Sequence, residues 1–181
     1  MNLKIEELKE RFILLEIWQL TINGAFQRAN VYSDGAKGEK MNKEKEEFKK
    51  ELREFVESIS NQYQSEIKEI NQHYSNIYSI STFSEKYEIL LKDKKLNFGI
   101  SQKLLNLYLK YLWCLGKIGT PPHFPVDRQI QVLLDDKNPT AWTNWGNDDG
   151  YNKVIDKAYS KRAIEGYDNI AELELELFLR I

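Results

Sequence analysis

The sequence has little cysteine and no long apolar run. Its 181 residues include one cysteine, Cys114, and four prolines. A single cysteine cannot form an intramolecular disulfide, and its place in the apolar run 111–115 predicts a buried thiol in a reducing compartment. No apolar stretch reaches the roughly 18–20 residues that cross a bilayer, and the first residues lack a signal-peptide pattern. We therefore expect a cytoplasmic protein with no membrane contact.

An excess of one charge sign is also missing. The chain carries 26 Lys and Arg residues against 28 Asp and Glu residues, which leaves a formal net charge of -2. A strongly basic surface, typical of non-specific nucleic-acid binders, is therefore not indicated. Acidic helices elsewhere can still offset a local basic stripe, so the balance leaves a local DNA-binding surface open.

Sequence motifs of several common chemistries are absent. The chain has no Cys/His cluster suited to zinc or iron–sulfur ligation, no phosphate-binding glycine loop and no G-x-S-x-G elbow. The two histidines, His73 and His123, lie far apart in the chain, and we interpret them as structural or surface residues. We expect no metal or other cofactor, and nucleotide hydrolases and serine hydrolases are disfavoured.

Helical periodicity, in contrast, fills most of the chain. Apolar residues step by three or four positions over residues 5–22, which predicts a core helix. The same spacing over residues 48–77 predicts a long amphipathic helix with a break near residues 58–61. Thr82 and Glu85 have the spacing of a capping box and predict a further short helix.

Residues 30–40 interrupt this periodicity. They include Gly35 and Gly38 among polar residues, which predicts a mobile surface loop. With 41% hydrophobic residues, the chain has enough apolar material for a sizeable core. We expect an all-α fold in which residues 1–181 form one compact multi-helix domain, or two closely apposed helical lobes.

The most informative region begins with a strongly apolar helix predicted over residues 104–115. Its polar residues are spaced by three, four and seven positions, which places them on one stripe of the helix. These residues are Lys103, Asn106, Lys110 and Lys117. The sequence therefore predicts a buried helix with a single polar edge.

A second polar element follows this helix. Residues 119–125 contain three prolines and cannot be helical, so the Pro-Val-Asp run at 125–127 should open a new helix with Asp127 as its N-cap. A Lys103/Asp127 pair across one cleft becomes plausible, and such pairs are common at active sites. The alternative is a solvated lysine and a purely structural cap.

The Gly-Ile-Ser-Gln-Lys run at 99–103, the apolar helix and the Pro-Val-Asp run at 125–127 resemble the helix-hairpin-helix superfamily of base-excision DNA glycosylases, in particular its divergent archaeal-type 8-oxoguanine glycosylases. The resemblance implies a helix-hairpin-helix-like element followed by a Pro-Val-Asp loop. It also implies that Lys103 attacks the sugar C1′ of a flipped, damaged nucleotide to form a Schiff base, while Asp127 assists departure of the base. Ser101 stands where the family's hairpin usually has a second glycine.

The same resemblance implies contacts with the DNA backbone. Gly99, Ile100 and Ser101 would hold a phosphate through their backbone amides, and Lys110 would add a charge contact if its face is open. The chain is also similar to a group of bacterial proteins that share its sequence blocks at residues 102–113, 122–127 and 170–175.

Two tryptophans lie beyond this region, beside glycine and asparagine. If Trp142 and Trp145 are exposed, they can stack on a flipped base. The alternative is that both fill a seam between helices, because aromatic side chains strongly favour burial.

These patterns lead to one hypothesis, one main alternative and a third possibility, which is a purely structural or partner-dependent helical module. The hypothesis is a DNA-repair enzyme, a DNA glycosylase with AP-lyase activity, whose partner is DNA containing a damaged or modified base and which needs no protein partner. The alternative is a non-catalytic helical module that binds nucleic acid or protein through its long mixed-charge helix or its loop at 30–40. The enzyme requires the Lys103 and Asp127 side chains to share one cleft that solvent reaches.

Overall fold

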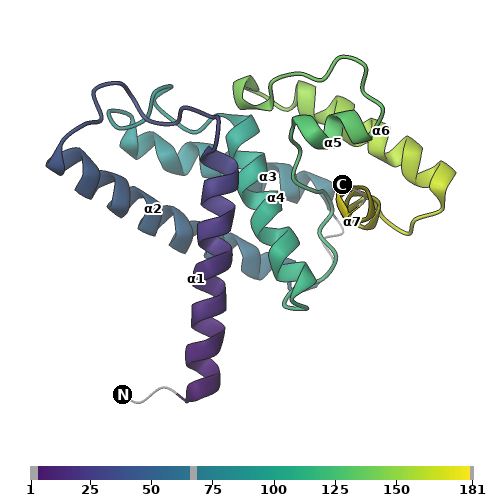
Figure 1. Ribbon diagram of the computed structural model, residues 1–181, viewed down its shortest axis with the longest axis horizontal. Helices are drawn as coiled ribbons and strands as arrows, with labels where there is room; N and C mark the ends of the chain where they lie inside the picture. The colour runs from purple at the N-terminus through teal and green to yellow at the C-terminus, as the bar shows by residue number, and fades with distance from the viewer. Residues whose placement is uncertain (1–3, 66–68, 180–181) are drawn as a thin grey trace.

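The computed structural model describes residues 4–65 and 69–179, and this part of the chain is mostly helical (Figure 1). In chain order the helices are α1 (Ile5–Phe26), α2 (Glu39–Ser60), α3 (Ile70–Ser84), α4 (Phe98–Cys114), α5 (Arg128–Leu133), α6 (Asp149–Glu165) and α7 (Ile170–Leu179), with short 3-10 turns at Asn61–Tyr63, Glu85–Tyr87 and Trp142–Asn144. The all-α prediction is confirmed. None of the described helices is long and apolar enough to cross a membrane.

Helix α4 lies at the centre of the arrangement (Figure 1). It packs against α1, α3 and the turn at 142–144, and residues 98–106 are all buried. The helix begins after Asn97, whose side-chain oxygen accepts the Ile100 N–H at 3.0 Å as an N-cap. The predicted buried helix is therefore present, and it begins earlier than its apolar run suggested.

Helix α1 departs from the prediction in its first half. The C-terminal half packs on the core through Trp18 and Ile22, whereas the N-terminal half extends away from the other helices (Figure 1). Ile5 is 63% exposed and Phe12 is 60% exposed. The prediction that the apolar residues of 5–22 all face the core is wrong for these positions, because periodicity identifies an apolar face without showing what covers it.

Other local predictions have mixed outcomes. The long periodic stretch is divided between α2 and α3, with the break at Asn61–Tyr63, close to where it was expected. The helix predicted from Thr82 and Glu85 is wrong, because Thr82 lies inside α3 and only a 3-10 turn follows. Cys114 is exposed at the end of α4, so the prediction of a buried thiol is also wrong.

The first half of the loop predicted at 30–40 is hydrogen-bonded to residues 90–92. The Ser33 N–H donates to the Leu90 carbonyl, and the Lys92 N–H donates to the Val31 carbonyl, both at 2.9 Å. Val31 and Ala36 are buried. The segment is thus anchored at these points, and its mobility stays a prediction.

Two chains of buried hydrogen bonds of the type Asn-Tyr-His cross the core. In the first, Asn76 Nδ2 lies 3.0 Å from the Tyr63 hydroxyl, which lies 2.8 Å from His73 Nδ1. The second chain consists of Asn106, Tyr151 and His123. Asn106 Nδ2 lies 2.9 Å from the Tyr151 hydroxyl, which lies 2.9 Å from His123 Nδ1. In each chain the amide donates to the tyrosine oxygen, so the tyrosine hydroxyl is free to donate to a neutral histidine.

These contacts explain the state of both histidines. Burial lowers the pKa of His123 to about 3. Burial, together with repulsion from His123, lowers the pKa of His73 well below its usual value. The two rings lie edge to face with centroids 4.9 Å apart. The histidines are therefore structural, as expected, although they are in contact and not isolated.

Acid pH is expected to weaken the fold through these two histidines. Their pKa values are lower in the folded chain than the roughly 6.5 of an unfolded chain, so the unfolded chain binds protons that the folded chain does not. The free energy of unfolding should therefore fall as the pH drops below about 6.5, by up to about 1.4 kcal/mol per pH unit for each histidine. Urea denaturation from about pH 7.5 to about pH 4.5 measures this slope.

The variant His123→Asn provides the control. This variant should reduce the slope of the unfolding free energy against pH by about one proton, because it removes one of the two histidines. Carboxylates with a lowered pKa, such as Asp127, lose their contribution at lower pH and do so equally in both proteins. An unchanged slope in the variant would contradict the neutral state of His123.

Candidate functional site

The side chain of Gln102 fixes the chain segment that leads to Asp127. Its Nε2 donates to the Val126 carbonyl at 2.8 Å, and its Oε1 accepts the Val126 N–H at 3.1 Å. Gln102 and Val126 are both fully buried. The side-chain amide of Gln102 thus binds both the N–H and the carbonyl of Val126. This pairing holds the next residue, Asp127, at a defined place beside α4.

Lys103 and Asp127 meet directly. Lys103 Nζ lies 2.6 Å from Asp127 Oδ2, while Asp127 Oδ1 accepts the Ile130 N–H at 3.0 Å and caps α5. The structure therefore brings together the two residues that the sequence paired. Lys103 lies in the second turn of α4, because the helix begins at Phe98.

The environment of Asp127 favours its charged form. Burial would raise the pKa of this carboxyl, but the Lys103 ammonium and the N–H groups of Ile130 and Gln129 more than offset burial, so its pKa is lowered. Asp127 is therefore a carboxylate at neutral pH. It can accept hydrogen bonds and stabilise a nearby positive charge.

A second ion pair lies seven residues further along the same side of α4. Lys110 Nζ lies 2.7 Å and 3.0 Å from the two carboxylate oxygens of Glu174 on α7, and 4.3 Å from the centroid of the Phe178 ring. Burial raises the pKa of Glu174, and Lys110 counteracts this rise. No role was predicted for Glu174. An acidic partner could still have been expected, because two lysines on a buried helix, Lys103 and Lys110, require acidic partners.

Both ion pairs line one small cavity of about 100 Å³. Two of its lining residues, Gln129 and Phe178, are exposed and therefore lie at its mouth. The remaining walls are mainly apolar and are formed by Leu107, Tyr111, Pro125, Ile130 and Leu133. Within residues 4–65 and 69–179, no group of three or more His, Cys, Asp or Glu side chains is arranged to hold a metal ion.

The two tryptophans are buried in this structure. Trp142 lies beside the ion pair, with its ring centroid 5.9 Å from Lys103 Nζ. Trp145 packs against Gly150 and donates its Nε1–H to Thr140 Oγ1 at 3.1 Å. Both rings therefore fill the seam around the start of α4, as the alternative interpretation expected.

The amides proposed to hold a DNA phosphate are used inside the chain. The Gly99 N–H donates to the Trp145 carbonyl at 3.0 Å. Asn97 accepts the Ile100 N–H through its side chain and the Ser101 N–H through its carbonyl. Gly99 lies in the first turn of α4, and the residues just before it, 88–97, are not helical, so a hairpin between two helices is not visible there. A phosphate could reach these amides only if the surrounding segments moved.

No family model, curated protein or solved structure that was compared with the chain matches it. The function is therefore inferred from the residues of the site.

Replacing Gly99 is expected to disrupt the site. A Cβ at this position would lie 1.8 Å from the Trp142 carbonyl oxygen, so the backbone of one segment must shift. Gly99→Ala should therefore lower the free energy of unfolding by about 2 kcal/mol or more in urea denaturation. Gly35→Ala is the matched control, because a Cβ there meets nothing within 4 Å, and it should change stability little. Equal effects of the two changes would contradict the close packing at Gly99.

The Lys110–Glu174 pair can be tested with a double-mutant cycle. Lys110→Met or Glu174→Leu alone leaves a charge in a buried site and should cost about 3–5 kcal/mol. The double variant should recover most of this loss, since it removes both charges and keeps apolar volume. Additive losses, measured by urea denaturation, would show that the two side chains do not interact.

Proposed function

We propose that the protein is a DNA glycosylase with AP-lyase activity, in which Lys103 is the nucleophile and Asp127 its electrostatic and proton-transfer partner. The observation that carries this proposal is the 2.6 Å contact between Lys103 Nζ and Asp127 Oδ2 at the wall of a cavity. An amine beside a carboxylate is the pair that base removal through a Schiff base requires. DNA with a damaged or modified base is the proposed partner.

The proposed reaction starts from the Lys103 ammonium and the Asp127 carboxylate. One proton passes from Lys103 to the departing base, the Nζ lone pair bonds to C1′, and the electrons of the C1′–N bond leave with the base. Asp127 stabilises the positive charge that builds at C1′. Asp127 then takes a second proton from Nζ and returns it to O4′ as the sugar ring opens, which leaves the Schiff base. Loss of a C2′ proton then expels the 3′ phosphate.

Substrate entry requires a local rearrangement. The cavity of about 100 Å³ is small, and the exposed side chains of Gln129 and Phe178 stand at its mouth. Moving the Phe178 side chain would also uncover the Lys110–Glu174 pair. The proposal therefore includes opening of the cavity between α5 and the end of α7 when a flipped nucleotide enters.

The alternative is a non-catalytic helical binding module. One observation favours it, namely the row of exposed apolar residues on the projecting half of α1, which is of the kind found at contact surfaces. The row consists of Ile5, Leu8, Phe12 and Leu15. In this alternative the Lys103–Asp127 pair only joins α4 to α5.

Borohydride trapping tests the enzymatic proposal. The wild type should form a covalent adduct with duplexes that contain an abasic site or a damaged base, and Lys103→Gln should form none. Lys117→Gln is the matched control, because this lysine, predicted on the same stripe, lies beyond the end of α4 at Cys114 and pairs with Glu10 at the surface, away from the cavity. It should trap as well as the wild type. A folded wild type that forms no adduct on any substrate, or a Lys103→Gln variant that still does, would remove the lyase mechanism.

Asp127→Asn separates the two steps of the same reaction. An amide cannot stabilise the positive charge at C1′ as a carboxylate does, so base release should slow by about a hundredfold or more. Trapping on a preformed abasic site should be less affected, since the base has already left. Circular dichroism confirms that the variant keeps its fold.

A further inference from the structure

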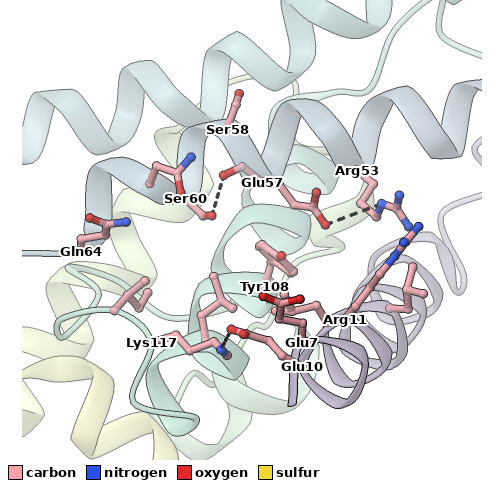
Figure 2. Close-up of a pocket in the computed structure, with 15 residues that line it drawn as sticks. Glu7, Glu10, Arg11, Arg53, Glu57, Ser58, Ser60, Gln64, Tyr108 and Lys117 are labelled. Carbon is pink, nitrogen blue, oxygen red and sulfur yellow. Dashed lines mark hydrogen bonds and ion pairs between the residues drawn. The ribbon is translucent and has the colours of Figure 1, made fainter. Parts of the chain in front are cut away.

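A second cleft lies on another face of α4 from the candidate site, since it is lined by Tyr108 and Leu112, whereas the cavity of the two ion pairs is lined by Leu107 and Tyr111. It has a volume of about 800 Å³ and is formed by the projecting half of α1, the end of α2 and the C-terminal end of α4 (Figure 2). This volume is within the range of small-molecule sites. Neither ion pair of the candidate site lines it.

Two arginines lie on one side of the cleft. Arg11 on α1 and Arg53 on α2 point toward one another there (Figure 2). The Arg11 side chain makes no hydrogen bond or ion pair with any described residue. Arg53 Nε forms an ion pair with Glu57 Oε1 at 3.6 Å, but this atom is buried without a hydrogen-bond partner (Figure 2). Two guanidinium groups that face each other repel unless an anion lies between them.

Each of the three carboxylates of the cleft already has a partner, and for Glu57 this partner is Arg53. Glu10 pairs with Lys117, and Glu7 accepts the backbone N–H of Lys4 at 3.1 Å. Burial raises the pKa of Glu57, and the Arg53 guanidinium partly offsets this rise. The Arg11 guanidinium and Arg53 Nε are therefore cationic donors of the cleft that lack a hydrogen-bond acceptor among the described residues. Guanidinium groups bind phosphates and carboxylates through two parallel hydrogen bonds.

The floor of the cleft is apolar. It is formed by two buried residues of α4 together with partly covered neighbours from α1 and from the segment after α4. These residues are Tyr108, Leu112, Leu14 and Ile118, and the exposed Leu15 lies at the edge. A ligand that fills the cleft would thus place an anionic group against the arginines and an apolar body on the floor.

We propose that this cleft binds a small molecule with one phosphate or carboxylate head group and an apolar body, and that Arg11 and Arg53 hold the head group between them. The site is separate from Lys103 and Asp127, and it stands whether or not the chain acts on DNA. It would give the protein a ligand-binding function in addition to the proposed reaction.

Calorimetric titration with octyl phosphate, octanoate and 1-octanol tests the proposal. Octyl phosphate and octanoate should bind the wild type, and the neutral alcohol should bind at least about tenfold more weakly. Arg11→Gln and Arg53→Gln should each weaken octyl phosphate binding by about tenfold or more, since each removes charged hydrogen bonds. Arg11 is exposed, so its variant is expected to keep the fold, and circular dichroism checks both variants.

The matched control is Arg28→Gln. Arg28 follows the far end of α1, is exposed and does not line the cleft, so affinity should stay within about twofold of the wild type. The proposal is overturned if octyl phosphate does not bind, or if Arg11→Gln and Arg28→Gln bind it equally well. It is also overturned if the alcohol binds as tightly as the phosphate. Displacement of octyl phosphate by undamaged duplex DNA, with affinity for that DNA lost in Arg11→Gln, would instead assign the two arginines to a nucleic-acid surface.

Discussion

The arrangement of the C-terminal part depends on one constraint, which is that the polar residues of a buried helix must find partners. Residues 98–106 of α4 are buried, so each of its polar side chains would cost free energy if left without a hydrogen bond. Four polar side chains of α4 have partners on later segments, whereas Ser101 Oγ is buried without a hydrogen-bond partner. Gln102 binds the backbone of Val126, Lys103 binds Asp127 on the start of α5, Asn106 binds Tyr151 on α6, and Lys110 binds Glu174 on α7. The stripe on α4 therefore orders the segments that follow it.

The same constraint places the candidate site. Gln102 and Asn106 are neutral and form ordinary buried hydrogen bonds, and a similar arrangement could be made with neutral residues throughout. Lysines at 103 and 110 are costlier, because each requires a buried or half-buried carboxylate to compensate its charge. Both lie along one cavity. The charged members of the stripe are therefore the residues to compare when a role in chemistry is sought.

Much of this could be predicted from the sequence, and the rest could not for identifiable reasons. The polar stripe and the Asp127 cap depend on local spacing and proline positions, so both were predicted. The partner of Lys110 could not be, because Glu174 is 64 residues away and its neighbours Glu172 and Glu176 have the same pattern. The exposure of Ile5 and Phe12 depends on what packs against α1, which periodicity does not reveal. The capping-box spacing at Thr82 also occurs by chance within a helix.

The two ion pairs of α4 offer an internal comparison for the role of Lys103. They lie seven residues apart on one helix and use the same chemistry. Their carboxylates differ in access, since the Glu174 side chain is 4% exposed and the Asp127 side chain is 32% exposed. A substrate must reach the reacting groups, and a carboxylate closed off from solvent can do little beyond compensating its lysine. The more open pair is therefore the better candidate for chemistry, and the closed pair for holding α7 against α4 so that the wall of the cavity exists.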